Sequence, residues 1–96
     1  MTLGIALAPA CTPPEERADA AREAVARAVE RGDRTAALDA IEDVHASLPD
    51  TPDALLEVSR LRIRAGDAPL AAWLLESGMR RYPDRDDVRL ALANVA

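Results

Sequence analysis

The residue types that carry out most nucleophilic and metal chemistry are scarce in this chain. It contains one cysteine, Cys11, and one histidine, His45. A single cysteine can form neither an internal disulfide nor a cysteine zinc cluster, and a single histidine lacks a partner for the usual imidazole metal sites. Cys11 also lies before the first expected helix, which disfavours a catalytic Cys–His pair. We therefore expect no catalytic residue, no metal site and no cofactor, and a protein that is not an enzyme.

Two short motifs that suggest chemistry have simpler structural explanations. Asp84, Asp86 and Asp87 cluster at the start of an expected helix, where the helix dipole favours acidic side chains. Their spacing lacks the glycine and the distal glutamate of a calcium loop. Residues 31–33 spell the integrin tripeptide RGD, but their expected place in a turn accounts for them.

Composition limits the class of protein. The chain has 96 residues, enough for one small domain, and a formal net charge of −5. It has no basic stripe for phosphate contacts, so we expect no nucleic-acid partner. Aromatic residues make up only 2% of the chain, and the apolar residues are mostly Ala, Leu and Val. This composition favours closely packed helices over a β-sandwich.

Residues 1–11, MTLGIALAPAC, form an uncharged and mostly apolar leader. It is too short to span a bilayer, which takes about 20 helical residues, but it matches the apolar core and small-residue end of a secretory signal. The stretch LAPAC resembles a bacterial lipoprotein signal, which would make Cys11 the lipidated residue and the only membrane anchor. Two localisations stay open: the cell envelope if the leader is a signal, and the cytoplasm if it is a loosely packed tail. In either case the folded domain is residues 12–96.

The rest of the chain repeats itself with a period of 34 residues. The phrase RGD at 31–33 returns as AGD at 65–67, and each copy is followed by a proline stop, LPD and then YPD. A fixed period of this length indicates a helical repeat array. The matching pairs are Asp19/Asp53, Ala20/Ala54, Glu23/Glu57, Gly32/Gly66, Asp33/Asp67, Ala37/Ala71, Glu42/Glu76, Pro49/Pro83 and Asp50/Asp84, with Asp53/Asp87 and Leu56/Leu90 opening a third copy.

Start and stop signals divide the repeats into helices. Glycine ends a helix cheaply in the left-handed conformation, and proline stops one or begins its first turn. Thr12, Asp33, Thr51, Asp67 and Asp84 are the expected capping residues. The signals predict an all-α fold of five antiparallel helices, at about 13–31, 34–47, 51–65, 68–81 and 85–95.

This pattern resembles the tetratricopeptide repeat family. In the second copy the turn and second-helix positions of that family correspond to Gly66, Asp67, Ala71, Leu75, Gly78 and Pro83, and in the first copy to Gly32, Asp33, Ala37, Ile41, Val44 and Pro49. The resemblance covers residues 18–96, about two and a third repeats. It implies a short right-handed superhelix of helix pairs whose concave groove binds a peptide or partner protein.

The resemblance also assigns residues to that groove. The inner wall would be formed by Arg22, Ala26, Val29, Leu56, Arg60, Ile63, Arg64, Leu90 and Asn94. These recur at helical spacing, so each helix contributes a stripe. Arginines beside an apolar floor would suit a peptide that carries carboxylates and small apolar side chains. The alternative is that the arginines pair with Asp53, Glu57 or Asp87 and only keep the face soluble.

Two further surfaces are candidates for contacts. Leu70, Trp73 and Leu74 would form an apolar patch on the outer side of the fourth helix, unless the leader or a neighbouring helix covers them. The C-terminal stretch VRLALANVA is almost uncharged, although solenoid ends normally carry a polar cap. An alternative function is therefore a structural subunit that forms a homo-oligomer by stacking through this helix. His45 is expected to pack at the position of Met79.

Overall fold

The computed structural model describes residues 12–95, and within that range every regular element is an α-helix. The all-α prediction is confirmed. Each helix begins and ends within about one residue of its predicted range. The predictions on residues 1–11, including the signal segment and lipidation of Cys11, lie outside the described residues. The helices are α2 (Pro14–Arg31), α3 (Arg34–Ser47), α4 (Pro52–Arg64), α5 (Ala68–Arg81) and α6 (Asp86–Val95).

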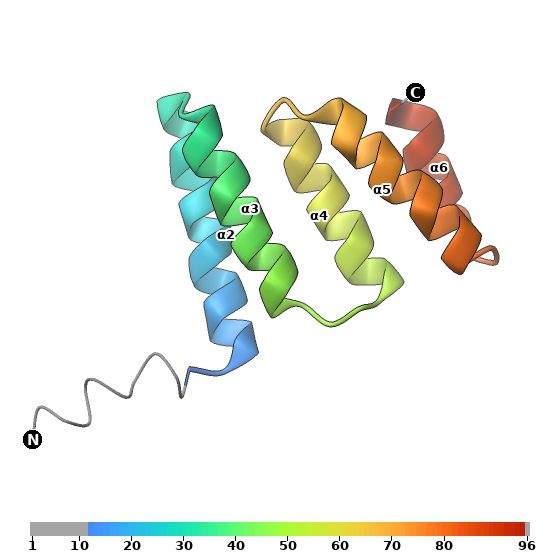
Figure 1. Cartoon of the computed structure of the whole chain (residues 1–96), viewed down its shortest axis with the longest axis horizontal. Helices are drawn as coiled ribbons and strands as arrows, with labels where there is room; N and C mark the ends of the chain where they lie inside the picture. Colours follow the sequence, from blue (N-terminus) through green and yellow to red (C-terminus); the bar gives the residue numbers. More distant parts are fainter. Residues whose placement is uncertain (1–11, 96) are drawn as a thin grey trace, which may run out of the picture.

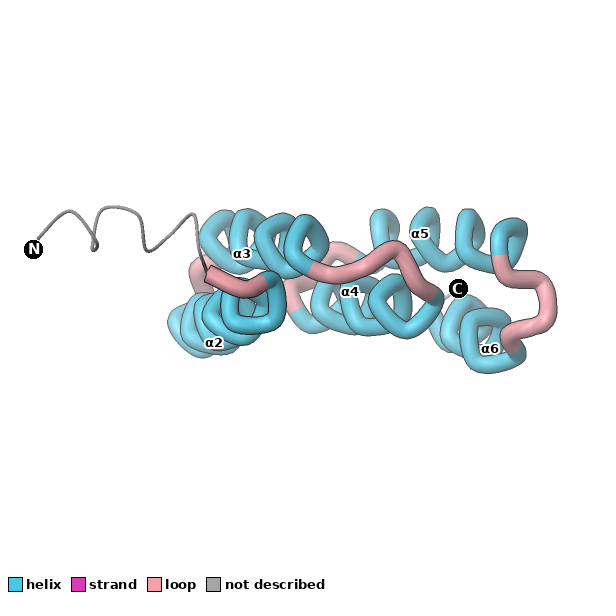
Figure 2. Tube along the Cα trace, turned by 90° about the horizontal axis from the view of Figure 1, so that it is seen from below, coloured by secondary structure: helices cyan, strands magenta, loops and turns pink. Residues whose placement is uncertain are grey.

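The helices follow one another in space in the order of the sequence, each antiparallel to the one before (Figure 1). Seen from below, they lie in two layers: α2, α4 and α6 form one layer, and α3 and α5 form the other (Figure 2). The result is a flat slab of 53 × 31 × 14 Å. Short turns between helices enforce this antiparallel order.

Two glycine turns connect the layers with the same hydrogen bonds. Gly32 and Gly66 have φ angles of 72° and 85°. These angles lie in the left-handed region, which residues with a Cβ atom rarely adopt. After each glycine an aspartate N–H bonds back to a helix carbonyl, Asp33 to Ala28 at 2.9 Å and Asp67 to Arg62 at 2.8 Å. This is the Schellman arrangement, and it satisfies carbonyls at the end of α2 and α4.

Two of the predicted helix caps are confirmed. The Asp33 carboxylate accepts a hydrogen bond of 3.1 Å from the N–H of Ala36, and the Thr51 hydroxyl accepts one of 3.2 Å from Ala54. Each cap satisfies an N–H group of the first helical turn that has no acceptor within its own helix. The caps therefore fix where α3 and α4 begin.

The other predicted caps are wrong in detail. Asp67 precedes α5 but its side chain makes no cap bond, because its carboxylate is turned to Arg62, with the Nη1 atom 3.4 Å away. Helix α2 begins at Pro14 after an extended Pro13, one residue later than a cap at Thr12 predicts. The last helix begins at Asp86, later than an Asp84 cap would require.

The apolar core consists of two clusters that meet in α4. The first joins α2, α3 and α4 through Ala21, Val25, Ala40, Ile41, Val44, Val58 and Leu61. The second joins α4, α5 and α6 through Leu56, Leu75 and Val88. Because α4 contributes to both clusters, it couples the two ends of the slab.

Candidate functional site

A groove of about 470 Å³ lies between α4 and α6, next to the start of α5. Its walls combine four residues that the sequence had assigned to the inner face with four that it had not. The predicted ones are Arg60, Ile63, Leu90 and Asn94; the others are Ala68, Asp87, Ala91 and Val95. The helices α4 and α6 belong to the same layer of the slab (Figure 2), and Ala68 is the first residue of α5 in the other layer.

The charge of this groove is dominated by Arg60. Its side chain is exposed and forms no hydrogen bond or ion pair with any residue in the described range. Asp87 also lines the groove, but Arg85 holds it through Nε–Oδ1 and Nη2–Oδ2 contacts of 3.0 and 2.6 Å. These hydrogen bonds to Arg85 lower the pKa of the Asp87 carboxyl, so Asp87 is a carboxylate whose charge is already compensated.

Ile63 and Leu90 form the apolar part of the groove. Their side chains are exposed, Ile63 at 42% and Leu90 at 63%. They lie on α4 and α6, so they approach the groove from opposite walls. The groove thus offers two exposed aliphatic side chains beside one unpaired guanidinium.

Arg22 does not contribute a free cation to this face. Its guanidinium binds the Glu57 carboxylate bidentately, with Nη2–Oε1 at 2.9 Å, and Nη1 donates to Asp19 at 2.6 Å. The hydrogen bond to Glu57 raises the pKa of Arg22. This ion pair joins α2 to α4. It agrees with the alternative expectation, in which an arginine of this face pairs with Glu57 and does not bind a peptide. Arg22 lines a separate hollow of about 410 Å³ near the start of α2.

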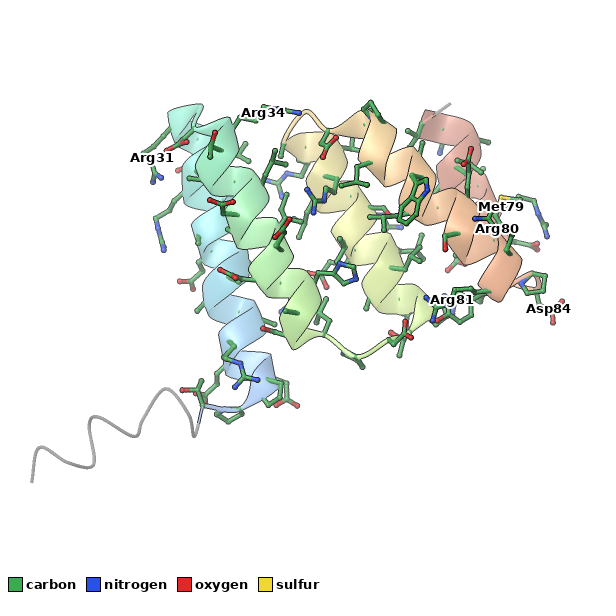
Figure 3. All side chains as sticks on the ribbon, viewed as in Figure 1. Arg31, Arg34, Met79, Arg80, Arg81 and Asp84 are labelled. Atoms are coloured by element: carbon green, nitrogen blue, oxygen red, sulfur yellow. The ribbon has the colours of Figure 1, made fainter. Side chains whose placement is uncertain are left out.

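Val29 and Arg64 line a third, smaller hollow of about 260 Å³ between the two glycine turns. Arg34 extends from the start of α3 toward the α4–α5 turn (Figure 3), where its Nη2 donates to the carbonyl of Gly66 at 3.2 Å. Arg64 has no hydrogen-bond or ion-pair partner within residues 12–95. Ala26 is exposed and lines none of these three hollows. The predicted inner face is therefore divided into separate hollows.

Leu56 is a correction to the predicted groove. It is only 4% exposed, because it packs in the second cluster with Leu75 and Val88. The 34-residue register makes it the counterpart of Leu90, but α6 lies beside α4 and covers it. It does not line the groove, and it offers almost no surface to a ligand.

The groove residues that sequence reasoning missed are of two kinds. Asp87, Ala91 and Val95 follow one another at helical spacing on α6 beside the predicted Leu90 and Asn94, so a wider stripe would have included them. Ala68 is the first residue of α5. It lines the groove because the α4–α5 turn places the start of α5 beside it. The helical periodicity of the sequence does not predict the path of this turn.

The predicted outer patch is partly exposed. Trp73 on α5 is 58% exposed, while Leu70 and Leu74 are half-buried. Leu74 packs against the first apolar cluster, so it acts mainly as a core residue. His45, expected to pack like Met79, is instead exposed at the surface of α3. Trp73 is therefore the principal apolar feature of this patch.

No group of His, Cys, Asp and Glu side chains in residues 12–95 has a geometry that could hold a metal ion. None of the described helices combines the length and the apolar character that crossing a membrane requires.

The comparisons with known proteins give no relative on which a function could be based. No family model, no curated protein and no solved structure matches the chain.

Proposed function

We propose that the protein is a protein-interaction module, a short solenoid of tetratricopeptide-like repeats that binds peptide segments in the groove between α4 and α6. The observation that carries the proposal is the combination of unpaired Arg60 with exposed Ile63 and Leu90 around one groove. Such a site suits an extended or helical segment that carries acidic and aliphatic side chains.

Several features of the fold support the repeat arrangement. The hydrogen bond from the Asp33 N–H to the Ala28 carbonyl recurs 34 residues later, from the Asp67 N–H to the Arg62 carbonyl. The first helix of each expected repeat lies in one layer and the second helix in the other (Figure 2). These regularities are those expected of stacked helix pairs.

The electrostatics support an acidic partner. Arginine presents a planar fork that binds a carboxylate through two parallel hydrogen bonds. The other ionisable residue of the groove, Asp87, already has Arg85 as its partner. A peptide carboxylate would therefore meet the unpaired Arg60 without displacing an existing ion pair.

The test uses short fluorescent peptides in which glutamate alternates with leucine, and matched peptides in which glutamine replaces glutamate. We expect the 96-residue chain to bind the acidic peptides more tightly than the glutamine peptides. Arg60→Glu should weaken that binding by at least about 1.5 kcal/mol, the scale of a charge-assisted hydrogen bond. Fluorescence anisotropy gives the affinities, and circular dichroism verifies that helix content is unchanged.

Arg80→Glu is the matched control. Arg80 is an exposed arginine on α5 (Figure 3), it does not line the groove, and it has no ion-pair partner among residues 12–95. Its substitution makes the same change in net charge and should leave the affinity unchanged. Equal losses of peptide affinity in Arg60→Glu and Arg80→Glu would indicate a general charge attraction.

A different outcome would place the site on the outer surface of α5. In that case Trp73→Ala abolishes peptide binding and Arg60→Glu leaves it unchanged.

A further inference from the structure

The hollow between the two glycine turns is separate from the α4–α6 groove. It has a volume of about 260 Å³, and both Gly32 and Gly66 line it. Its apolar lining consists of small side chains, namely Ala28, Val29, Ala37 and Ala65. The ionisable residues of its lining are Asp33, Arg34 and Arg64. The hollow therefore brings together two arginines that come from different helices.

Arg34 is held at one wall of this hollow. Its Nη2 donates to the carbonyl of Gly66 at 3.2 Å, and its Nε lies 3.6 Å from the position that a Cβ atom at Gly66 would occupy. The side chain thus extends from the start of α3 to the α4–α5 turn (Figure 3). A guanidinium has five N–H donors, so this hydrogen bond leaves most of them available to a ligand.

Arg64 brings a second guanidinium from the last turn of α4. It is exposed and has no hydrogen-bond or ion-pair partner within residues 12–95. Most arginines in this range do pair with a carboxylate, as Arg22 pairs with Glu57. Two guanidinium groups at one hollow repel each other, and an anion bound between them would replace that repulsion by attraction.

The groups of the hollow that would repel an anion are already engaged. Asp33 accepts the cap hydrogen bond of 3.1 Å from Ala36 through Oδ1, and its Oδ2 lies 3.9 Å from Nη2 of Arg31. The carbonyls of Ala28 and Val29 at the end of α2 accept hydrogen bonds from the N–H groups of the first turn. The unneutralised charge of the hollow is therefore positive.

We infer that this hollow binds a phosphate group between Arg34 and Arg64. Two guanidinium groups match a dianion in charge. They come from different helices, and a tetrahedral anion offers oxygens on every side, whereas one guanidinium fork already satisfies a planar carboxylate. The small side chains of the lining leave room for a short organic group on the phosphate. The inference does not rest on the proposed peptide site, because neither arginine lines the α4–α6 groove.

The experiment is an NMR titration of the nitrogen-15-labelled 96-residue chain with sodium phosphate, with sodium chloride at the same ionic strength as the reference. We expect saturable shifts of the backbone amides of Gly32, Arg34 and Gly66, and none at Arg60 or Leu90. Acetate should bind at least about tenfold more weakly than phosphate, because it engages only one guanidinium. Ethyl phosphate distinguishes two sources of the group. Tighter binding than phosphate indicates an ester and equal binding indicates the free ion, and either result supports the inference.

Arg64→Gln is the decisive variant, because Arg64 has no bond to another described residue that its loss would break. It should raise the dissociation constant for phosphate at least about tenfold. Arg80→Gln makes the same change in charge away from the hollow and should leave that constant unchanged. Arg34→Gln should act like Arg64→Gln, and circular dichroism verifies that it folds without the bond to Gly66.

Three results overturn the inference. The first is an absence of saturable shifts beyond those that chloride causes, which would mean an adventitious ion only. The second is a set of shifts centred on Arg60 and the groove. The third is an Arg64→Gln protein that binds phosphate as tightly as the unmodified chain.

Discussion

At the scale of the residue, the least expected feature is a buried arginine. Arg62 is 7% exposed, its Nε atom has no hydrogen-bond partner, and its Nη1 atom is 3.4 Å from the Asp67 carboxylate. The nearest other carboxylate, Glu42, is 4.0 Å away and largely exposed. Asp67 is therefore the main group that compensates a buried charge, and this explains why it does not cap α5.

This assignment predicts that Asp67→Ala and Asp33→Ala have different costs, although the two aspartates occupy equivalent turns. Asp33→Ala removes a helix cap and should cost about 1 kcal/mol of unfolding free energy. Asp67→Ala leaves Arg62 without its closest partner and should cost more, about 2 kcal/mol or above. Urea denaturation monitored by circular dichroism measures both.

A second substitution separates the loss of a helix cap from the loss of an ion-pair partner. Arg62→Met removes the buried charge and keeps most of the side-chain volume, so it should restore much of the stability lost in Asp67→Ala. It should not restore Asp33→Ala, because that cap belongs to another helix. Additive effects of Arg62→Met and Asp67→Ala would show that the ion pair contributes nothing.

At the scale of the element, the approach of three helices depends on a missing side chain. Gly78 in α5 is buried, and a Cβ atom there would lie 2.9 Å from Leu55 Cδ2 and 3.3 Å from Val88 Cγ1. Leu55 belongs to α4 and Val88 to α6. The glycine therefore lets α4 and α6 close on α5, which forms the second apolar cluster and places the walls of the groove.

We expect Gly78→Val to lower the free energy of unfolding by about 2 kcal/mol, because overpacking outweighs the gain in helix propensity. In a Leu55→Ala background the same substitution should cost less, because its methyl groups enter the space that Leu55 vacates. A double-mutant cycle by chemical denaturation should give a coupling energy of about 1 kcal/mol. A coupling near zero would mean that Leu55 does not limit the helix approach.

At the scale of the whole molecule, stability is unevenly distributed. Helix α4 takes part in both apolar clusters and buries residues along most of its length. Helix α6 has a single fully buried residue, Val88, and an exposed outer face. Arg85 adds a polar link from the start of α6 to α4, with Nη2 2.8 Å from Asp53. Such a chain should open from the α6 end first.

Hydrogen exchange of the full chain tests this order. We expect backbone amides of α6 to exchange at least about tenfold faster than those of α4, with α2 and α3 between them. The measurement is made at low protein concentration, so that self-association does not protect α6. Uniform protection of all helices would show instead that the slab unfolds as one cooperative unit.

The sequence by itself determined the helices and the turns between them. Glycine, proline and capping residues act over a few neighbouring residues, so Gly32, Gly66 and Thr51 mark their boundaries without reference to the rest of the molecule. The same local signals placed the start of α5 correctly after Asp67, but they wrongly predicted that its side chain caps the helix. For Asp67 the reason is that its carboxylate binds Arg62, a contact that outweighs the local cap.

Only the tertiary structure decided which side chains form a surface. Leu56 and Leu90 occupy equivalent positions in the repeat, yet α6 covers the first and no described helix covers the second. Arg22 and Arg60 were expected to act alike, yet only Arg22 has a carboxylate within reach. Burial and ion pairing depend on what lies beside a residue in space, whereas the repeat pattern specifies only which way the residue faces on its own helix.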